Sequence, residues 1–155
     1  MEKMIICYFS ASGTTKIVAE KLSSITNSNL FEIKPVDEYS EKDLDWQDKN
    51  SRSSIEMSDV TSRPEMKDKL ENIEDYTKVL IGYPIWWDLA PRIINTFIEH
   101  TNLNNKKVYL FATSGGSGIE GSVTDLRRTY PNINFVRGKR LNETITNDEI
   151  LSWLG

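Results

Sequence analysis

The sequence predicts an α/β protein: an open, doubly wound sheet of five parallel strands with helices on both faces. Two observations support this fold class. Apolar runs of strand length alternate five times with segments of helical spacing along the 155 residues, a pattern typical of parallel strands joined by crossover helices. Three of the runs are continuously apolar, which indicates strands that are buried on both faces. A chain of this length suits one domain, so we expect residues 1–155 to fold as a single domain.

The strands are expected at residues 3–9, 29–34, 77–82, 106–112 and 133–137. Between them, apolar residues recur three or four positions apart, which is the spacing of one helical face. Such faces are formed by Val18, Leu22 and Ile25, by Met66, Leu70 and Ile73, by Ile93, Ile94, Phe97 and Ile98, and by Val123 and Leu126.

Two of the expected helices begin with a recognisable cap. Ser62 and Glu65 have capping-box spacing, and Pro64 stands at the first helical position, so a helix is predicted to start there. Thr146 and Glu149 repeat the spacing just before the apolar C-terminal residues, which predicts a last helix.

The segment from Val36 to Val60 has no clear period and holds eight acidic and three basic residues, a net charge of −5. Its composition favours a solvated, partly mobile excursion from the fold. However, Trp46, Ile55 and Met57 are apolar, and a second interpretation is a flap that packs over the functional site.

Charge and cysteine content exclude several classes of function. The net charge is −4 and no basic run stands out, so neither nucleic acid nor an anionic membrane is an expected partner. The single cysteine, Cys7, lies in an apolar strand and is expected to be a small buried side chain in a reducing compartment. The apolar run after Met1 is too short for a signal peptide or a membrane span, and we expect a cytoplasmic protein.

The first expected strand runs into Ser10-Ala11-Ser12-Gly13-Thr14-Thr15 and then into a helix. Amides at a helix start lack intrahelical partners and favour an anion, and the hydroxyls add donors without a counter-charge. The loop has neither the Walker pattern nor G-x-G-x-x-G, so a terminal phosphate monoester is the expected ligand. An ordinary strand–turn–helix connection would use similar residues.

Two further loops follow strands that we expect to end at the same edge of the sheet. The run Pro84-Ile85-Trp86-Trp87 offers a rigid apolar surface suited to a flat aromatic ligand, although paired tryptophans can also simply fill a core. The run Thr113-Ser114-Gly115-Gly116 can expose amides to carbonyl oxygens of such a ring. A phosphate socket, an aromatic wall and an amide-rich loop together predict flavin mononucleotide (FMN) as the cofactor.

At these residues the chain resembles the flavodoxin family over nearly its whole length. The run Ser10 to Thr15 is similar to the family's phosphate loop, and the runs from Gly82 and Thr113 are similar to its two ring-binding loops. The stretch Ser51-Arg52-Ser53 with Glu56 resembles one found in a bacterial short-chain branch. The resemblance implies the strand order 2-1-3-4-5, tight non-covalent FMN and one-electron transfer between redox proteins, one a reductase donor and the other an oxidised acceptor.

The resemblance also leaves questions open. Well-known flavodoxins are strongly acidic, whereas this chain is only mildly negative, so the identity of the partners stays open. We expect a monomer that carries electrons, with no catalytic side chain and no metal site. His100, at the far end of an expected helix, is predicted to be exposed or to cap that helix.

The alternative to an electron carrier is an FMN-dependent NAD(P)H:quinone reductase or azoreductase, because Pro84, Trp86, Trp87 and Pro91 also resemble the ring loop of that family.

Overall fold

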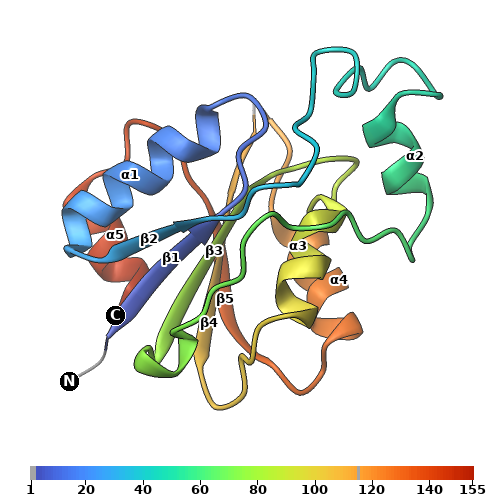
Figure 1. Ribbon diagram of the computed structural model, residues 1–155. Coiled ribbons are helices and arrows are strands. Elements are labelled where there is room, and N and C mark those ends of the chain that lie inside the picture. Colours follow the sequence, from blue (N-terminus) through green and yellow to red (C-terminus); the bar gives the residue numbers. More distant parts are fainter. Residues whose placement is uncertain (1–2, 115) are drawn as a thin grey trace.

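The computed structural model describes residues 3–114 and 116–155. Its centre is one sheet of five parallel strands in the order β2-β1-β3-β4-β5, which confirms both the predicted fold class and the strand order (Figure 1). The strands are β1 (Met4–Tyr8), β2 (Asn29–Glu32), β3 (Lys78–Pro84), β4 (Lys107–Thr113) and β5 (Asn134–Arg140).

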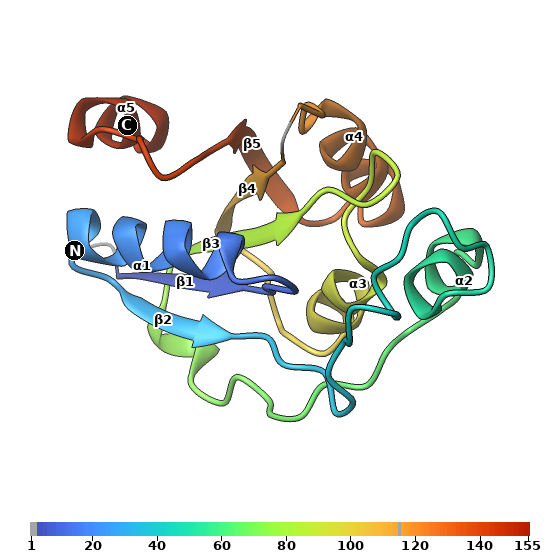
Figure 2. The same ribbon diagram turned by 90° about the horizontal axis from the view of Figure 1, so that it is seen from above.

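Helices cover both faces of the sheet, as Figure 2 shows from above. One face carries α1 (Thr14–Thr26) and α5 (Asn147–Leu154), and the other carries α3 (Arg92–Glu99) and α4 (Glu120–Thr129). Side chains of β1 alternate between the two layers: Ile5 and Cys7 pack with α3 and α4, whereas Ile6 packs with α1. The continuously apolar strands therefore serve two hydrophobic cores, one on each face.

Several local predictions are confirmed. The hydroxyl of Thr146 accepts a hydrogen bond from the amide of Glu149 (3.2 Å) and caps α5. His100 ends α3, where its Nδ1 lies 2.8 Å from the carbonyl oxygen of Thr96. Cys7 is fully buried, and this burial raises the pKa of its thiol, as expected for a core side chain rather than a nucleophile.

The prediction of a helix after Ser62 is wrong. Residues 62–72 contain no helix, and the helical structure between residue 62 and β3 is limited to a short 3-10 turn, η1 (Ile73–Asp75). The amide of Lys67 donates instead to the carbonyl of Lys34 (2.8 Å), and the amide of Val36 donates to that of Glu65 (2.9 Å). Pairing with the chain that leaves β2 thus uses backbone groups that a helix would need. Met66 still packs against the core from this extended segment, so the apolar pattern is satisfied without a helix.

The acidic segment 36–60 contains the short helix α2 (Arg52–Ser58), which lies beyond the carboxyl ends of the strands (Figure 1). The Ser51 hydroxyl caps it by accepting from the amide of Ser54 (3.3 Å). Met57 is buried, whereas Trp46 and Ile55 are exposed. The segment is therefore packed in part, as the flap interpretation requires, and solvated in part.

No helix in the part of the chain that the structure describes is both long enough and apolar enough to cross a bilayer.

Candidate functional site

A cavity of about 800 Å³ opens at the carboxyl end of the sheet. Open α/β sheets bind ligands at this end, beside the point where the strand order reverses. In this protein the reversal lies at β1, which has β2 on one side and β3 on the other. The predicted loops contribute Ser12, Thr14, Pro84, Ile85, Trp86, Thr113 and Ser114 to the lining.

Ser10 organises the loop that joins β1 to α1. Its Oγ accepts hydrogen bonds from the amides of Gly13 (3.1 Å) and Lys16 (3.2 Å). Gly13 has a φ of 98°, and a Cβ placed there would meet no atom within 4 Å. The glycine is therefore required by its backbone conformation and not by lack of space.

The first turn of α1 leaves amides free to bind an anion. The amide of Ile17 makes the first helical bond, to the carbonyl of Gly13 (3.1 Å), and the amide of Lys16 is taken by Ser10. Among residues 3–114 and 116–155, no group accepts a hydrogen bond from the amides of Thr14 and Thr15. These two amides, the helix dipole and the hydroxyls of Ser12 and Thr14 form a donor set that suits a phosphate group.

A buried hydroxyl pair ties this loop to the neighbouring strand. Thr15 Oγ1 lies 2.7 Å from Thr113 Oγ1, and the two residues are only 1% and 4% exposed. Thr113 is also part of the cavity lining. The pair therefore fixes the start of α1 against the end of β4, and the Thr15 side chain supports the cavity without lining it.

The second loop ends in a tight turn that separates the two tryptophans. Trp86 and Leu89 exchange backbone hydrogen bonds (2.9 and 3.0 Å), and both residues between them, Trp87 and Asp88, have positive φ angles of 49° and 67°. Positive φ at both central residues is the geometry of two-residue hairpin turns. Trp86 lines the main cavity, whereas Trp87 lines a separate pocket of about 470 Å³ together with Trp46.

The Trp86 indole is held edge-on by two aromatic rings. Its centroid lies 5.7 Å from that of Phe9, at an interplanar angle of 90°, and 5.4 Å from that of Tyr39, at 70°. Phe9 and Tyr39 also contact each other edge-on, at 5.6 Å. Such edge-to-face packing is the favourable arrangement for aromatic pairs, and it fixes the plane of the indole at the cavity wall.

The remaining predicted contact residues lie outside the cavity lining. Ser10, Gly13 and Thr15 shape the phosphate loop, and Ala11 lines a small neighbouring pocket. Gly116 is exposed and does not line the cavity. Gly115 lies outside the residues that the structure describes.

Sequence reasoning missed the contribution of the loop after β5. From this loop, the cavity is lined by Leu141, Asn142, Glu143 and Thr144, and Ser117 of the predicted loop after β4 lines it as well. The predicted strand ended at residue 137, whereas β5 continues to Arg140, which brings this loop to the same edge of the sheet. The polar run after Leu141 could have indicated a loop at the end of the last strand. Its Asn142 Oδ1 accepts from the amide (2.9 Å) and the hydroxyl (2.6 Å) of Thr144, as in an Asx turn.

The chemistry of the lining suits a neutral ring with one phosphate. Among the lining residues that the structure describes, Glu143 is the one with an ionisable side chain, and the other side chains are hydroxyls, an amide and apolar groups. Flavin mononucleotide has a single phosphate for the loop at α1 and a flat heterocycle for the surface of Pro84, Ile85 and Trp86. The residues present therefore fit the expected cofactor.

Comparison with known proteins supports the same assignment. The family model described as flavodoxin matches residues 3–155. The fold is similar to that of a candidate flavoprotein from Bacteroides eggerthii, at 51% identity and a TM-score of 0.97, covering 99% of this chain and 96% of that one. It is also similar to a candidate flavoprotein from Bacteroides uniformis, at 44% identity and a TM-score of 0.93, covering 99% and 97%.

A flavoprotein from Lactobacillus acidophilus, solved in complex with FMN, is 28% identical with a TM-score of 0.78 and full coverage of both chains. No curated protein matches the sequence. The family match spans nearly the whole chain and agrees with the strand order and the phosphate loop: the chain belongs to the flavodoxin family.

Proposed function

We propose that this protein binds FMN non-covalently in the cavity at the carboxyl end of the sheet and carries electrons between redox proteins. The observation that carries this proposal is the arrangement of the lining. Free amides and hydroxyls at the start of α1 lie at one part of the cavity, and the Trp86 wall lies at another. The complex of FMN with the flavoprotein from Lactobacillus acidophilus supports the choice of cofactor.

The phosphate end would be bound by the start of α1. The amides of Thr14 and Thr15 and the hydroxyls of Ser12 and Thr14 supply neutral donors, and the helix dipole adds a favourable field. Ser10 keeps these groups in place by binding two amides of its own loop. Because the donors are held before the ligand arrives, little ordering is needed on binding.

The ring would lie against the apolar part of the lining. Pro84, Ile85 and Trp86 exclude water from this part, and Phe9 and Tyr39 keep the indole of Trp86 from turning. Bound FMN would supply the redox chemistry, and the protein would supply binding, orientation and the local environment. Electron transfer of this kind needs no acid or base from the chain, which is consistent with a lining whose single ionisable side chain is Glu143.

The first experiment is a titration of the apoprotein with FMN, followed by quenching of flavin fluorescence. We expect the wild type to bind, and Thr14→Val to bind at least about tenfold more weakly, because a hydrogen bond to a charged group contributes roughly 1.5–3 kcal/mol. Thr129→Val is the matched control, since Thr129 lies at the far end of α4 and its hydroxyl donates to the carbonyl of Asp125. A folded wild type that does not bind FMN would refute the proposal.

A second experiment separates the carrier from an enzyme. The FMN-loaded protein is mixed with NADPH and a soluble quinone, with and without an added flavodoxin reductase. A carrier should oxidise NADPH slowly on its own and much faster when the reductase is present. Rapid quinone reduction without the added reductase would instead identify an NAD(P)H:quinone reductase.

A further inference from the structure

Three side chains outside the cavity form a closed network behind Trp86. The guanidinium of Arg52 lies 3.8 Å from the ring centroid of Tyr39, and its Nε lies 3.0 Å from Oε2 of Glu56. The hydroxyl of Tyr39 donates to the other oxygen of the same carboxylate. Each member therefore contacts the other two, and neither the ring nor the hydroxyl of Tyr39 can shift alone.

The network is shielded enough for these contacts to matter. The side chains of Arg52 and Glu56 are 25% and 12% exposed. Burial and the hydrogen bond to Glu56 raise the pKa of Tyr39, so its hydroxyl stays a donor over the whole physiological range. Arg52 also donates to the carbonyl of Asp37 (2.7 Å), which ties α2 to the chain next to Tyr39.

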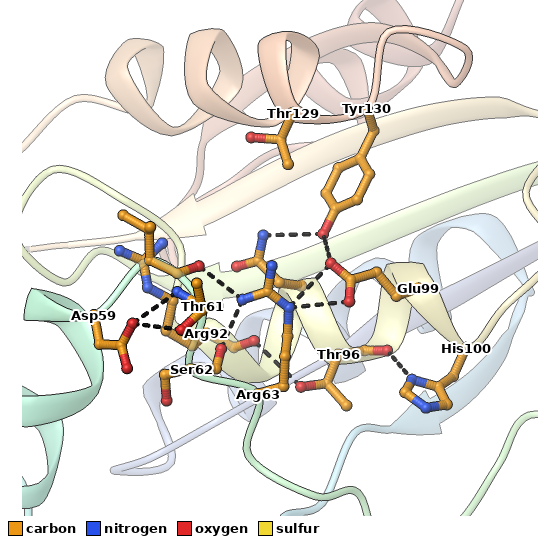
Figure 3. Close-up of polar contacts among 12 residues, drawn as sticks. Asp59, Thr61, Ser62, Arg63, Arg92, Thr96, Glu99, His100, Thr129 and Tyr130 are labelled. Carbon is orange, nitrogen blue, oxygen red and sulfur yellow. Dashed lines mark hydrogen bonds and ion pairs between the residues drawn. The ribbon is translucent and has the colours of Figure 1, made fainter.

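The body of the protein anchors the other end of α2. Arg92, the first residue of α3, is 4% exposed and donates to the carbonyls of Met57 (3.1 Å) and Glu56 (3.4 Å). Figure 3 shows a second anchor further along, where Arg63 reaches the carboxylate of Glu99 (3.0 Å). The segment that carries the network is thus fastened on both sides and can act as a support.

We propose that Tyr39, held by Arg52 and Glu56, is a positioning residue that sets the orientation of Trp86 in the cavity wall and thereby the affinity and environment of the bound flavin. This inference rests on the proposed binding of FMN. The contact with the indole at 5.4 Å is its route to the main cavity wall, because Tyr39, Arg52 and Glu56 do not line that cavity. Tyr39 also packs on Phe9 and lines the small pocket beside Ser10 and Ala11, so the test includes a Trp86→Leu background. The Val36–Val60 segment would then tune the site from outside.

The test compares FMN affinity and the visible circular dichroism of bound flavin at saturation in a series of variants. Tyr39→Leu removes the aromatic contact and should weaken FMN binding by about two- to tenfold, the range for one aromatic pair. It should also change the dichroism of the bound flavin. Tyr39→Phe keeps the ring contact with Trp86 but loses the hydrogen bond to Glu56, so it should restore affinity and dichroism only in part.

Two further variants separate position from charge. Glu56→Gln weakens the network of Tyr39, Arg52 and Glu56, and it should shift the flavin dichroism in the same direction as Tyr39→Leu does. Glu41→Gln removes the same charge from an exposed side chain of the same segment, and it should leave the dichroism unchanged. In a Trp86→Leu background, Tyr39→Leu should weaken FMN binding no further, because the residue it acts through is gone.

The outcomes distinguish the two proposals. A folded wild type that does not bind FMN refutes the proposed function and this inference together. A wild type that binds FMN, with Tyr39→Leu and Glu56→Gln giving the same affinity and dichroism, overturns the inference alone. An equal effect of Tyr39→Leu with and without Trp86 would also overturn it. If Tyr39→Leu does not fold, Glu56→Gln against Glu41→Gln decides the question.

Discussion

Gly121 lies in the first turns of α4, and its missing side chain lets the turn at Trp86–Leu89 approach that helix. A Cβ at Gly121 would stand 2.1 Å from Oδ2 of Asp88 and 2.8 Å from the backbone oxygen of Asp88. The carboxylate can rotate away, but the backbone oxygen can move only if the turn moves. We therefore expect Gly121→Ala to displace the turn that carries Trp86.

The sign of the stability change tests this reasoning. An alanine in place of glycine within a helix stabilises a protein by about 1 kcal/mol when nothing obstructs it. Forcing an extra methyl group into a packed contact costs about 1–3 kcal/mol. For Gly121→Ala the two effects leave a net loss of up to roughly 2 kcal/mol in the free energy of unfolding.

Urea denaturation of four proteins provides the assay: wild type, Gly121→Ala, Asp88→Gly and the double variant. Asp88→Gly removes the carboxylate and suits the positive φ of 67° at that position. In this background the carboxylate clash is gone and the clash with the backbone oxygen of residue 88 remains, so Gly121→Ala should cost somewhat less and still be destabilising. The coupling in the double-mutant cycle reports the carboxylate's share. A Gly121→Ala protein that is more stable than the wild type by about 1 kcal/mol would refute the close contact.

Two further predictions concern the phosphate loop and the response to acid. Ser10→Ala leaves the amides of Gly13 and Lys16 without their acceptor, so unfolding should become easier by about 0.5–2 kcal/mol, as for a lost helix cap, and FMN should bind more weakly. Denaturant titration and flavin fluorescence measure the two effects, and an unchanged midpoint would contradict the role of Ser10. Burial would raise the pKa of Glu99, but hydrogen bonds from Arg63 and Tyr130 lower it overall, below its reference of 4.5. A carboxylate whose pKa is lower in the folded than in the unfolded protein stabilises the fold at pH values above its unfolded pKa. This stabilisation is lost as the pH falls through its folded pKa. Glu99→Gln should therefore lose less stability than the wild type between pH 5 and pH 3, and an equal loss would show that this carboxylate does not contribute.

The fold was predictable because each central strand carries its own signal. The runs around Ile6, Leu80 and Leu110 are continuously apolar, as expected for strands covered on both faces, and the helical spacings between them favour a parallel sheet. The helix expected after Ser62 failed for a reason that local pattern cannot supply. The cap residues and the spacing of Met66 fit a helix, but the strand-like pairing with Lys34 depends on a segment distant in sequence.

The candidate site was predictable to the extent that it follows the ends of β1, β3 and β4. Ser12, Thr14 and Trp86 stand directly after predicted strands, and the structure gathers them around one cavity. The separation of Trp86 from Trp87 could not be foreseen, because it arises from positive φ at residues 87 and 88; aspartate adopts this conformation comparatively readily, but tryptophan rarely does. The support given to Trp86 by Tyr39 was hidden for a similar reason, since it joins residues far apart in sequence.

The acidic composition of the Val36–Val60 segment is largely explained by its local folding. Ser40 and Asp43 cap each other, the amide of Ser40 donating to the carboxylate (2.9 Å) and the amide of Asp43 to the hydroxyl (3.1 Å). Asp45, Asp48 and Asp59 each accept a hydrogen bond from an amide two residues further on. Aspartate is favoured at such turns because its short carboxylate reaches the backbone.

These turns change what the charge of the segment implies. The hydrogen bonds from Ser40 lower the pKa of Asp43, and those from Thr61 lower the pKa of Asp59, as expected where a charged carboxylate accepts from the backbone. A further carboxylate, that of Glu56, is paired with Arg52 and holds Tyr39. A composition that could be taken as a surface for basic partners therefore has a structural cause: aspartates fold the segment, and the folded segment supports the wall of the proposed flavin site.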